Sequence, residues 1–589
     1  MAKLDKINSL VKWAEANGAE ISPDVQFKEL STDNIGAIYK GTEKPDGASY
    51  PINIPFKIII TPKTATSNFG ESFKNISDSQ ANSILKLYLC RERINPDSFY
   101  HPYLQLLPNL AAIDSPCTWS AADKALLQGT NLGNSLKENL ASLVEEWWSV
   151  INLLQDEVPK PEQHYVNMKY YYEYKFYTDD DLDKYLNDED IENWTSFPNY
   201  LWASLILKSR SFPAYLINQE SFNKSDAMLL PVVDLLNHNP QAKVNWDVSD
   251  GFFKFKSESI VPGNEIFNNY GLKGNEELLL AYGFCIENNP RDSVALKIKL
   301  PEEKIKEIEN YGVKLPSIED YTNSVVDSET KSSDNNNSSN YKDGILFFIN
   351  QENIPESLIQ TFQFLVQNSW EKNGEISLRM QLSGLNHLRA ALETKKSMLK
   401  LDTIPKDGTT KHNYIKWYIE SQSKIFTSAI KQIKGLEKEL LSTKKSQLIT
   451  LKNVYKKDTT FQQSLLFLGF SDYDSILESQ FQDQCWLLWL IRCYNRDQYD
   501  IESSYLPEWI SVLFTKLRND TDITAQDVIN YKPIYENLVP DLSVQVPEVY
   551  GKGNWTLSEF IIAAKLLDLI SFVRGKEQEC ILVEQTYAS

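Results

Sequence analysis

The sequence predicts an α+β fold, with short β-strands and a helical insertion in its first half and mostly helices in its second half. Short runs of β-branched and aromatic residues, bounded by turn-forming residues, occur up to about residue 300. Beyond Pro301, apolar residues recur at helical spacing. The length of 589 residues exceeds a typical domain several times over, so we expect about two to four domains.

The expected boundaries follow from this change of pattern. Residues 1–300 form the first domain, with a helical insert at about 80–225. Residues 301–589 form a helical second domain, which contains a low-complexity loop at about 328–340 (SETKSSDNNNSSN).

The first domain opens with an amphipathic helix, in which Leu4, Ile7, Leu10, Val11 and Ala14 recur at helical spacing. Gly18 stands where a helix end favours a residue at positive φ. Short strands are expected next, at Val25–Phe27, Gly36–Tyr39 and Tyr50–Ile60. Helices follow from about Ser79 to Leu107, and a helix at Tyr200–Leu207 leads into Ser209-Arg210-Ser211-Phe212.

Residues 228–284 carry three polar patterns that an ordinary core would not contain. Asp234 to His238 (DLLNH) follows a Val-rich run that is typical of a buried strand. Asn268-Asn269-Tyr270-Gly271 follows an expected hairpin made of Phe252–Phe255, a turn at Val261-Pro262-Gly263, and Glu265–Phe267. Tyr282-Gly283-Phe284 ends a short helix at Asn275–Ala281, for which Asn275 is the expected N-cap.

The second domain is expected to begin after a strand at Val294–Leu300. One long helix carries a single apolar stripe, made of Ile415, Tyr418, Ile419, Phe426, Ile430, Ile433, Leu436 and Leu440. Gln484 to Cys493 is apolar all round and is therefore expected to form a buried helix.

Composition limits the partners and the compartment. The net charge of −20 disfavours direct nucleic-acid binding and favours a basic protein partner. The six cysteines contain no CxxC pair, which argues against a zinc site or a disulfide framework, so we expect no metal. No apolar run reaches the ~18 residues of a membrane span, and the first residues do not form a signal peptide, so the cytosol or nucleus is expected.

The DLLNH segment, the Pro262-Gly263-x-Glu265 turn, Asn269-Tyr270-Gly271 and Tyr282-Gly283-Phe284 occur in an order and at a spacing that resemble the second half of a SET-domain lysine methyltransferase. The pattern is similar to the class typified by the plant Rubisco large-subunit methyltransferase. Its fungal relatives modify ribosomal proteins, elongation factors and cytochrome c. This resemblance implies a SET domain, S-adenosylmethionine as the methyl donor, and a helical C-terminal domain that binds the protein substrate.

The resemblance also implies roles for individual residues. Tyr270 matches the catalytic tyrosine, and Asp234 and Tyr282 match the pocket for the substrate lysine. The cofactor-binding positions are matched by Asn34, Ile35, Gly36, Arg210, Asn237, His238 and Phe284. Asn34 stands where the family has the first glycine of a Gly-x-Gly turn. Because Asn tolerates left-handed backbone better than other non-glycine residues, the turn can be kept with Asn34, and the sequence leaves open whether it is.

The chemistry of methyl transfer agrees with these roles. An in-line displacement needs a neutral amine aligned with the methyl group and shielded from water. A tyrosine hydroxyl can orient the amine by accepting its hydrogen bond, and burial beside a positive sulfonium lowers the pKa of the lysine. His238 as a general base is the alternative.

Two other classes of function stay open at this point: a SET-derived module that binds a partner without methylating it, and a helical scaffold without a cofactor. For the enzyme, a ribosomal protein is the expected substrate, an elongation factor the second candidate and cytochrome c the third. The protein is expected to be a monomer.

Overall fold

The computed structural model describes residues 3–31, 34–45, 50–73, 80–187, 190–316, 344–372, 375–479, 481–500, 503–575 and 579–585. Contacts within the chain group these residues into two compact units. The first unit contains residues 3–294 and 397–424, and the second contains most of the remainder. The expected loop at 328–340 lies outside the described residues, and the expected domain boundary at residue 300 stays a prediction.

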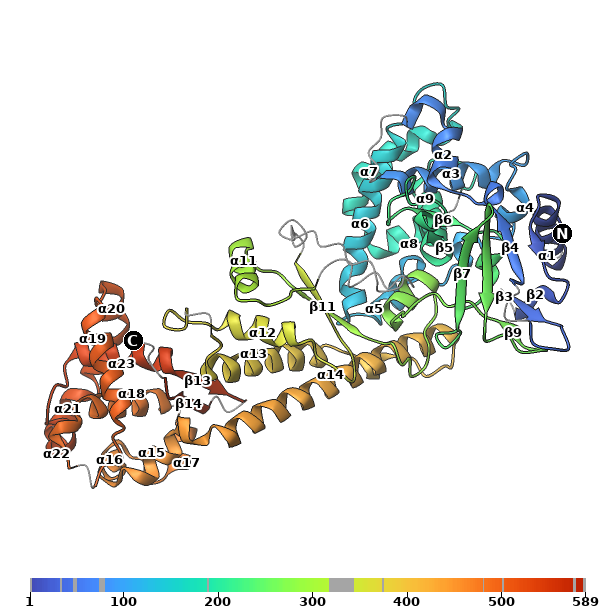
Figure 1. Cartoon of the computed structure of the whole chain (residues 1–589). Coiled ribbons are helices and arrows are strands. Elements are labelled where there is room, and N and C mark those ends of the chain that lie inside the picture. Colours follow the sequence, from blue (N-terminus) through green and yellow to red (C-terminus); the bar gives the residue numbers. More distant parts are fainter. Residues whose placement is uncertain are drawn as a thin grey trace. The chain divides into compact units, whose positions relative to one another are not determined.

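The largest sheet of the first unit joins strands from both ends of the predicted first domain (Figure 1). Its order is β1-β4-β8-β7, with bounds Glu20–Ile21, Ile52–Pro55, Phe252–Ser257 and Val244–Ser249. Alternate residues of β8 are buried, including Phe253 and Phe255, because successive side chains of a strand point to opposite faces. Ile52 lies opposite Phe255, so this buried face is shared with β4.

Two smaller sheets complete the strand-rich part of this unit. One has the order β2-β3-β9, with bounds Val25–Ser31, Asn34–Tyr39 and Glu265–Ile266, and the other pairs β5 (Ser211–Pro213) with β6 (Ala227–Leu229). The helix α1 (Lys3–Ala16) buries Ile7, Leu10 and Ala14, as its apolar spacing predicts. Gly18 follows with a φ of 93°, which confirms the expected helix end.

The expected hairpin between Phe252–Phe255 and Glu265–Phe267 is wrong. Strand β8 pairs with β4 and β7, whereas β9 pairs with β3, so the two segments belong to different sheets. The expected strand Tyr50–Ile60 is also too long, because the strand ends at Pro55 and a 3-10 turn follows at Phe56–Ile58. Alternating apolar residues indicate a strand but do not specify its partner.

Helix α2 (Pro62–Asn68) precedes the predicted insert. The insert itself contains α3 to α9, with bounds Ala81–Ile94, His101–Leu104, Ala121–Ala125, Asn131–Ile151, Val166–Glu173, Asp179–Asn187 and Phe197–Arg210. Large aromatic side chains fill its core, and Trp147, Tyr200 and Trp202 are fully buried. Helix α9 is buried on nearly all sides as far as Leu207, so Arg210 at its end is held at a fixed position.

A π-helix lies near the end of residues 228–284, the stretch that carries the three polar patterns. The helix α10 (Asn275–Glu277) continues as a π-helical turn, Leu278–Tyr282, a geometry that often marks functional sites. The N-cap of α10 is Gly274, so the expectation for Asn275 is wrong. The side chain of Asn275 instead bonds the backbone of Ile286 in both directions at 3.0 Å, which fixes the chain beyond the π-helix.

The second unit is mainly helical. It includes α11 (Glu302–Asn310), α12 (Glu356–Leu365), α13 (Leu378–Ser397) and α15 to α23, whose bounds are Leu451–Lys457, Thr459–Leu465, Tyr473–Glu478, Gln482–Tyr494, Glu508–Asp520, Ala525–Glu536, Val539–Gln545, Pro547–Tyr550 and Leu557–Ile570. Strand β10 (Val294–Ile298) pairs with β11 (Ile345–Ile349). A three-stranded sheet has the order β12-β14-β13, with bounds Leu448–Thr450, Glu579–Val583 and Ser571–Arg574. Helix α18 (Gln482–Tyr494) is buried from Cys485 to Cys493, as predicted.

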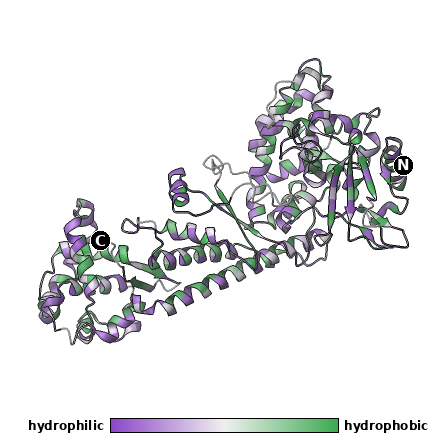
Figure 2. Ribbon diagram, in the orientation of Figure 1, coloured by the Kyte–Doolittle hydropathy of each residue, from purple (hydrophilic) through white to green (hydrophobic). Residues whose placement is uncertain are grey.

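Helix α14 (Thr410–Thr443) confirms the long helix that the apolar stripe predicts. Figure 2 shows hydrophobic and hydrophilic residues alternating along its ribbon. Ile415, Tyr418 and Ile419 are fully buried, but Leu436 is 41% exposed and falls outside the packed stripe. Residues 410–424 of this helix belong to the first unit and residues 425–443 to the second.

No helix among the described residues combines the length and apolar character needed to cross a membrane. No group of three or more His, Cys, Asp or Glu side chains within the described ranges could hold a metal ion.

Candidate active site

Two of the polar patterns meet at a parallel bridge between His238 and Asn268. The N–H of Asn268 donates to the carbonyl of Asn237 at 2.8 Å, and the N–H of Asn239 donates to the carbonyl of Asn268 at 2.9 Å. These backbone bonds hold DLLNH directly beside the segment that carries Tyr270. Their proximity therefore does not depend on flexible side chains.

Tyr270 is the central residue of an aromatic stack. Its ring lies 4.9 Å from the ring of His238 and 4.9 Å from that of Tyr282, with an interplanar angle of 19° in each case. Its hydroxyl donates to the carbonyl of Leu236 at 2.9 Å. Burial, together with the nearby Asp234 and Glu265, raises the pKa of Tyr270 to about 12 despite the opposing effect of Arg210, so the hydroxyl stays neutral near pH 7.

His238 is held as a neutral imidazole. Burial, with a smaller effect of Lys273, lowers its pKa to about 4. The backbone N–H of Tyr270 donates to Nδ1 at 3.0 Å, so the ring proton lies on Nε2. This tautomer has no free lone pair on the ring, which argues against the alternative that His238 is a general base.

The DLLNH segment begins with backbone strain. Val232 has a φ of 80°, a left-handed conformation that is a rare outlier for a β-branched residue. A 3-10 turn at Val233–Leu235 follows, so the expected buried strand ends early, at Leu229. Such strain persists only where the surrounding structure enforces it, and it is common at functional sites.

Asp234 is buried between Tyr103 and Arg210. The hydroxyl of Tyr103 donates to Oδ2 at 2.7 Å, and Nη1 of Arg210 lies 3.5 Å from the same oxygen. Nη1 of Arg210 also donates to the backbone carbonyl of Asp234 at 3.0 Å. Burial raises the pKa of Asp234, and the Arg210 charge and the Tyr103 hydroxyl partly offset this effect.

Asn237 connects the DLLNH segment with β3 and β9. Its amide Nδ2 donates to Asn34 Oδ1 at 2.9 Å and to Glu265 Oε1 at 2.7 Å. A Cβ on Gly36 would lie 2.8 Å from Glu265 Oε1 and 2.5 Å from Leu30 Cδ1, so a larger residue would displace the ends of these side chains. Ile35 lies between these positions on β3 and is partly buried.

Asn34 does not adopt the left-handed backbone that Asn can tolerate. It begins strand β3 and is absent from the described residues with positive φ. Its side chain instead accepts the hydrogen bond from Asn237. A glycine could not supply this acceptor, which gives Asn34 a structural reason to replace the first glycine of the turn.

Tyr282 and Phe284 lie on either side of a required glycine. Gly283 has a φ of 76°, and an added Cβ would lie 2.6 Å from the carbonyl oxygen of Asp114. The rings of Tyr282 and Phe284 meet edge to face with their centroids 6.3 Å apart. The sharp change of direction at Gly283 therefore joins Phe284 to the stack of Tyr282, Tyr270 and His238.

Part of α14 supports the π-helix. The hydroxyl of Tyr418 donates to Glu276 Oε2 at 2.7 Å. Leu279 and Cys285 share a hydrophobic cluster with Ile415 and Ile419. These residues follow Pro301 by more than a hundred positions, but they belong to the same compact unit as the site.

Three buried polar atoms at this site have no hydrogen-bond partner within the described part of the chain. They are Asp234 Oδ1, His238 Nε2 and Asn268 Nδ2. Buried polar groups are normally paired, so unpartnered ones are candidates for contact with a ligand. Two of the three are donors, and a carboxylate or hydroxyl group of a ligand could accept from them.

The structure brings the predicted site residues together around Tyr270. The resemblance assigns Arg210 to the cofactor, but in the structure Arg210 bonds Asp234, a residue predicted to line the lysine pocket. Two further residues were not predicted as site residues. Glu265 belongs to the Pro-Gly-x-Glu turn, so the motif itself could have pointed to it. Tyr103 has no such signal, because its partner Asp234 is 131 positions away.

Comparisons with known proteins show which family the chain belongs to. The SET domain family model matches residues 57–271, and the EFM1 middle domain model matches residues 293–444. The chain is 31% identical to Ribosomal lysine N-methyltransferase 1 of Saccharomyces cerevisiae, over 88% of this chain and 91% of that protein. It is 27% identical to Protein-lysine N-methyltransferase EFM1 of the same yeast, over 99% of this chain and 98% of that protein.

Solved structures confirm the fold. The SET domain of LSMT bound to lysine and AdoHcy matches with a TM-score of 0.54 and 16% identity, over 82% of this chain and all of that chain. Rubisco LSMT bound to AdoMet matches with a TM-score of 0.53 and 17% identity, over 81% of this chain and 99% of that chain. The SET-type α+β fold expected from the motifs is therefore confirmed. With its SET domain and its 31% identity to a yeast methyltransferase over most of both chains, this chain belongs to the SET-domain protein-lysine N-methyltransferases.

Proposed function

We propose that this enzyme transfers a methyl group from S-adenosylmethionine to a lysine side chain of a ribosomal protein. The proposed reaction rests mainly on the position of the Tyr270 hydroxyl. This hydroxyl donates a hydrogen bond to the carbonyl of Leu236, close to the bridge between His238 and Asn268. A neutral hydroxyl oriented in this way is suited to position an uncharged amine.

The residues present fit the cofactor. S-adenosylmethionine supplies the methyl group and a positive sulfonium. The residues proposed to hold it are Asn34, Ile35, Gly36, Asn237, His238 and Phe284. Arg210, which bonds Asp234, is instead proposed to lie on the side of the lysine pocket. His238 Nε2 is a buried donor without a partner in the described residues, as expected where a polar ligand approaches closely. The side chains of Glu265 and Asn237 lie against Gly36 on β3, so a Cβ there would disturb the neighbouring site residue Asn237.

Tyr270 acts by orientation in this proposal. Because its proton is donated to the Leu236 carbonyl, its oxygen keeps lone pairs that accept a hydrogen bond from the lysine amine. The bound amine then directs its own lone pair away from the tyrosine, toward the methyl group. Tyr282 and Asp234 are proposed to line the lysine pocket.

The lysine must also be neutral when it reacts. Burial against the stacked rings of Tyr270 and Tyr282 disfavours the ammonium form and so lowers the pKa of the lysine. Neither His238, which already carries its proton on Nε2, nor another base is needed for the transfer itself. Water exclusion and alignment provide the catalysis.

Two observations support a ribosomal protein as the substrate. The relative that shares 31% identity over 91% of its length is named a ribosomal lysine methyltransferase. The charge of −20 favours association with a basic protein, and ribosomal proteins are basic and abundant. An elongation factor is the second candidate and cytochrome c the third, both from the family resemblance. Six buried cysteines with free thiols support the cytosol or nucleus as the compartment.

Two experiments test this function. Calorimetry should show binding of S-adenosylmethionine to the purified full chain without added metal, and absence of heat with this ligand and with its demethylated product would contradict the cofactor assignment. Mass spectrometry of ribosomal proteins and elongation factors from a deletion strain should show the loss of a methyl-lysine. If every methyl-lysine persists in both sets, the translation-apparatus substrate is wrong.

A further inference from the structure

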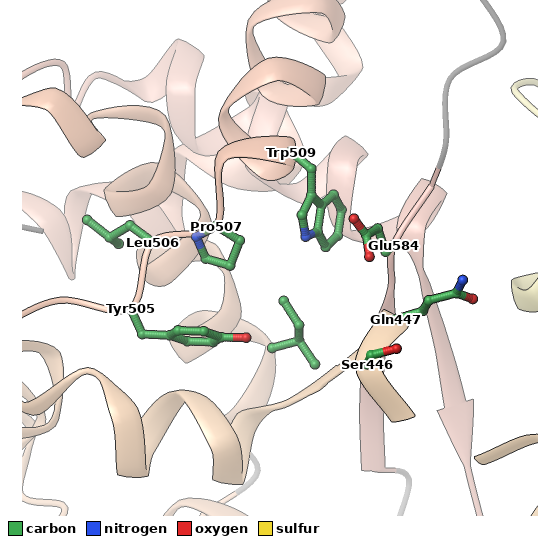
Figure 3. A pocket seen from close by; sticks show the side chains of 8 residues that line it. Ser446, Gln447, Tyr505, Leu506, Pro507, Trp509 and Glu584 are labelled. Carbon is green, nitrogen blue, oxygen red and sulfur yellow. The ribbon is translucent and has the colours of Figure 1, made fainter. Parts of the chain in front are cut away.

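The second unit contains a cavity of about 350 Å³ with aromatic walls (Figure 3). Its lining residues come from the β12 edge, from the segment before α19 and from the end of β14: Ser446, Gln447, Ile449, Tyr505, Leu506, Pro507, Trp509 and Glu584. Figure 3 shows the Tyr505 ring and the Trp509 indole bordering the space, with the Glu584 carboxylate beside the indole.

The cavity has a fixed framework. Ile449 and Leu506 are buried, and Tyr505 stacks on the core residue Trp489 with a centroid distance of 6.0 Å. The N–H of Glu584 donates to the carbonyl of Gln447 at 2.8 Å, which holds the end of β14 against the β12 segment. These contacts therefore fix the segments that carry Tyr505 and Glu584 before any ligand binds.

The hydroxyl of Tyr505, the indole N–H of Trp509 and the carboxylate of Glu584 are among the polar groups of the cavity lining that have no hydrogen-bond or ion-pair partner within the residues that the structure describes. The adjacent Glu508, by contrast, lies 3.4 Å from Arg496 in an ion pair. The polar groups that face the cavity are thus free to bind a ligand.

The chemistry of the lining favours a cation. Glu584 is the only carboxylate, amine, guanidinium or imidazole among the lining residues, and it can pair with a cation that enters beside the indole. Lys457 Nζ lies 4.5 Å from the ring centroid of Tyr505, so this ring already has a cationic partner and the Trp509 indole is the aromatic face that remains for a ligand. Trp is the strongest cation–π partner among the aromatic residues, and the Trp509 indole has no such partner among the described residues.

We propose that this cavity binds a lysine or arginine side chain of the protein substrate, with the cation between Glu584 and the Trp509 indole. The stem of such a side chain is apolar and fits against Ile449, Leu506 and Pro507. This inference rests on the proposed function and adds a second basic anchor to it, separate from the lysine that enters the Tyr270 pocket. Selectivity then requires a substrate that presents two basic residues at once.

A titration tests the cavity without methyl transfer. The full chain is labelled with fluorotryptophan and followed by fluorine NMR. It is titrated with Nα-acetyl-arginine methylamide and, separately, with the uncharged citrulline counterpart. Loss of one signal in Trp509→Phe assigns the Trp509 resonance. The arginine compound should shift this resonance and the citrulline compound should not. Equal shifts by both compounds, or a shift only with a proline-rich peptide, would overturn the proposal.

Matched variants test the same cavity in catalysis. Glu584→Gln and Trp509→Ala should raise the KM for the intact ribosomal-protein substrate on the order of tenfold, with kcat unchanged. Glu548→Gln, which removes the same charge at an exposed position of this unit, should leave KM unchanged. Thermal unfolding confirms that each variant is folded, and the conservative Tyr505→Phe provides a further check with a smaller rise in KM.

The two proposals fail in different ways. If the wild-type chain methylates no protein, the proposed function fails, and the titration still decides whether the cavity binds a cation. If the wild-type chain methylates its substrate and neither Glu584→Gln nor Trp509→Ala changes KM, the cavity inference is overturned and the function stands.

Discussion

The hydroxyl of Tyr103 and Oδ2 of Asp234 are 2.7 Å apart, although these residues are separated by 131 positions in the chain. Tyr103 is fully buried and burial, with the nearby Asp234, raises its pKa well above the usual value, so it remains a donor. Asp234 is two residues before Leu236, whose carbonyl accepts the hydrogen bond from Tyr270. Tyr103 therefore supports the backbone that orients the predicted catalytic hydroxyl.

Tyr103→Phe should lower both stability and activity. The substitution leaves a buried carboxylate oxygen without its neutral donor, which should cost about 1–3 kcal/mol of the free energy of unfolding. The methylation rate should fall because the Leu236 carbonyl is less well fixed. Urea unfolding and steady-state kinetics measure the two effects.

The matched control for this variant is Tyr174→Phe. Its hydroxyl bonds Glu145 at 3.2 Å on the exposed surface, so the same chemical change should alter unfolding by less than about 0.5 kcal/mol. Equal effects of the two substitutions would mean that the buried contact with Asp234 has no special role.

Tyr270→Phe should separate catalysis from folding. Phenylalanine keeps the ring that stacks between His238 and Tyr282, so the fold and the cofactor affinity should be retained. Loss of the hydrogen bond to the Leu236 carbonyl should lower the free energy of unfolding by about 0.5–1.5 kcal/mol. The methylation rate should fall about 10²-fold, as for loss of one contact made in the transition state. Single-turnover kinetics measure it, and Tyr282→Phe is the comparison. An unchanged rate in Tyr270→Phe would make Tyr282 the next candidate for the catalytic role.

Gly36→Ala should weaken cofactor binding selectively. The new Cβ would lie 2.8 Å from Glu265 Oε1 and 3.1 Å from Asn237 Nδ2, so both side chains must move. We expect the dissociation constant for S-adenosylmethionine to rise on the order of tenfold in calorimetry, equivalent to about 1.4 kcal/mol. Gly435→Ala is the control, since no atom lies within 4 Å of its added Cβ, and its affinity should equal that of the wild type.

The free energy of unfolding should decrease as the pH falls, because His238 binds a proton more readily in the unfolded chain. Its pKa is lowered from 6.5 in the unfolded chain to about 4 in the folded chain. The unfolded state therefore binds the proton more readily between these values, so the contribution is present above 6.5 and is lost as the pH falls toward 4. The loss should reach up to about 2 kcal/mol between about pH 7 and 5, reduced by the partial exposure of the ring.

His238→Asn isolates this contribution from other titrating groups. Asparagine can still accept the N–H of Tyr270 but does not titrate, so its stability should depend less on pH than that of the wild type. Urea unfolding at the two pH values gives the comparison. Parallel pH profiles for the two proteins would show that His238 is not the group responsible.

The sequence by itself determined the family and most of the central site. DLLNH, Asn269-Tyr270-Gly271 and Tyr282-Gly283-Phe284 each combine polar or aromatic residues within a few positions, and such local patterns are visible without a fold. Helices α1, α14 and α18 were also predicted, because helical spacing of apolar residues determines which face becomes buried.

Only the tertiary structure decided which distant segments meet. Strand β9 pairs with β3 and not with β8, because backbone groups of any strand can pair and the choice depends on packing of the whole unit. The bond from Tyr103 to Asp234 and the link from Asn34 through Asn237 to Glu265 arise in the same way. A side chain's type indicates that it needs a partner when buried, but the fold supplies that partner.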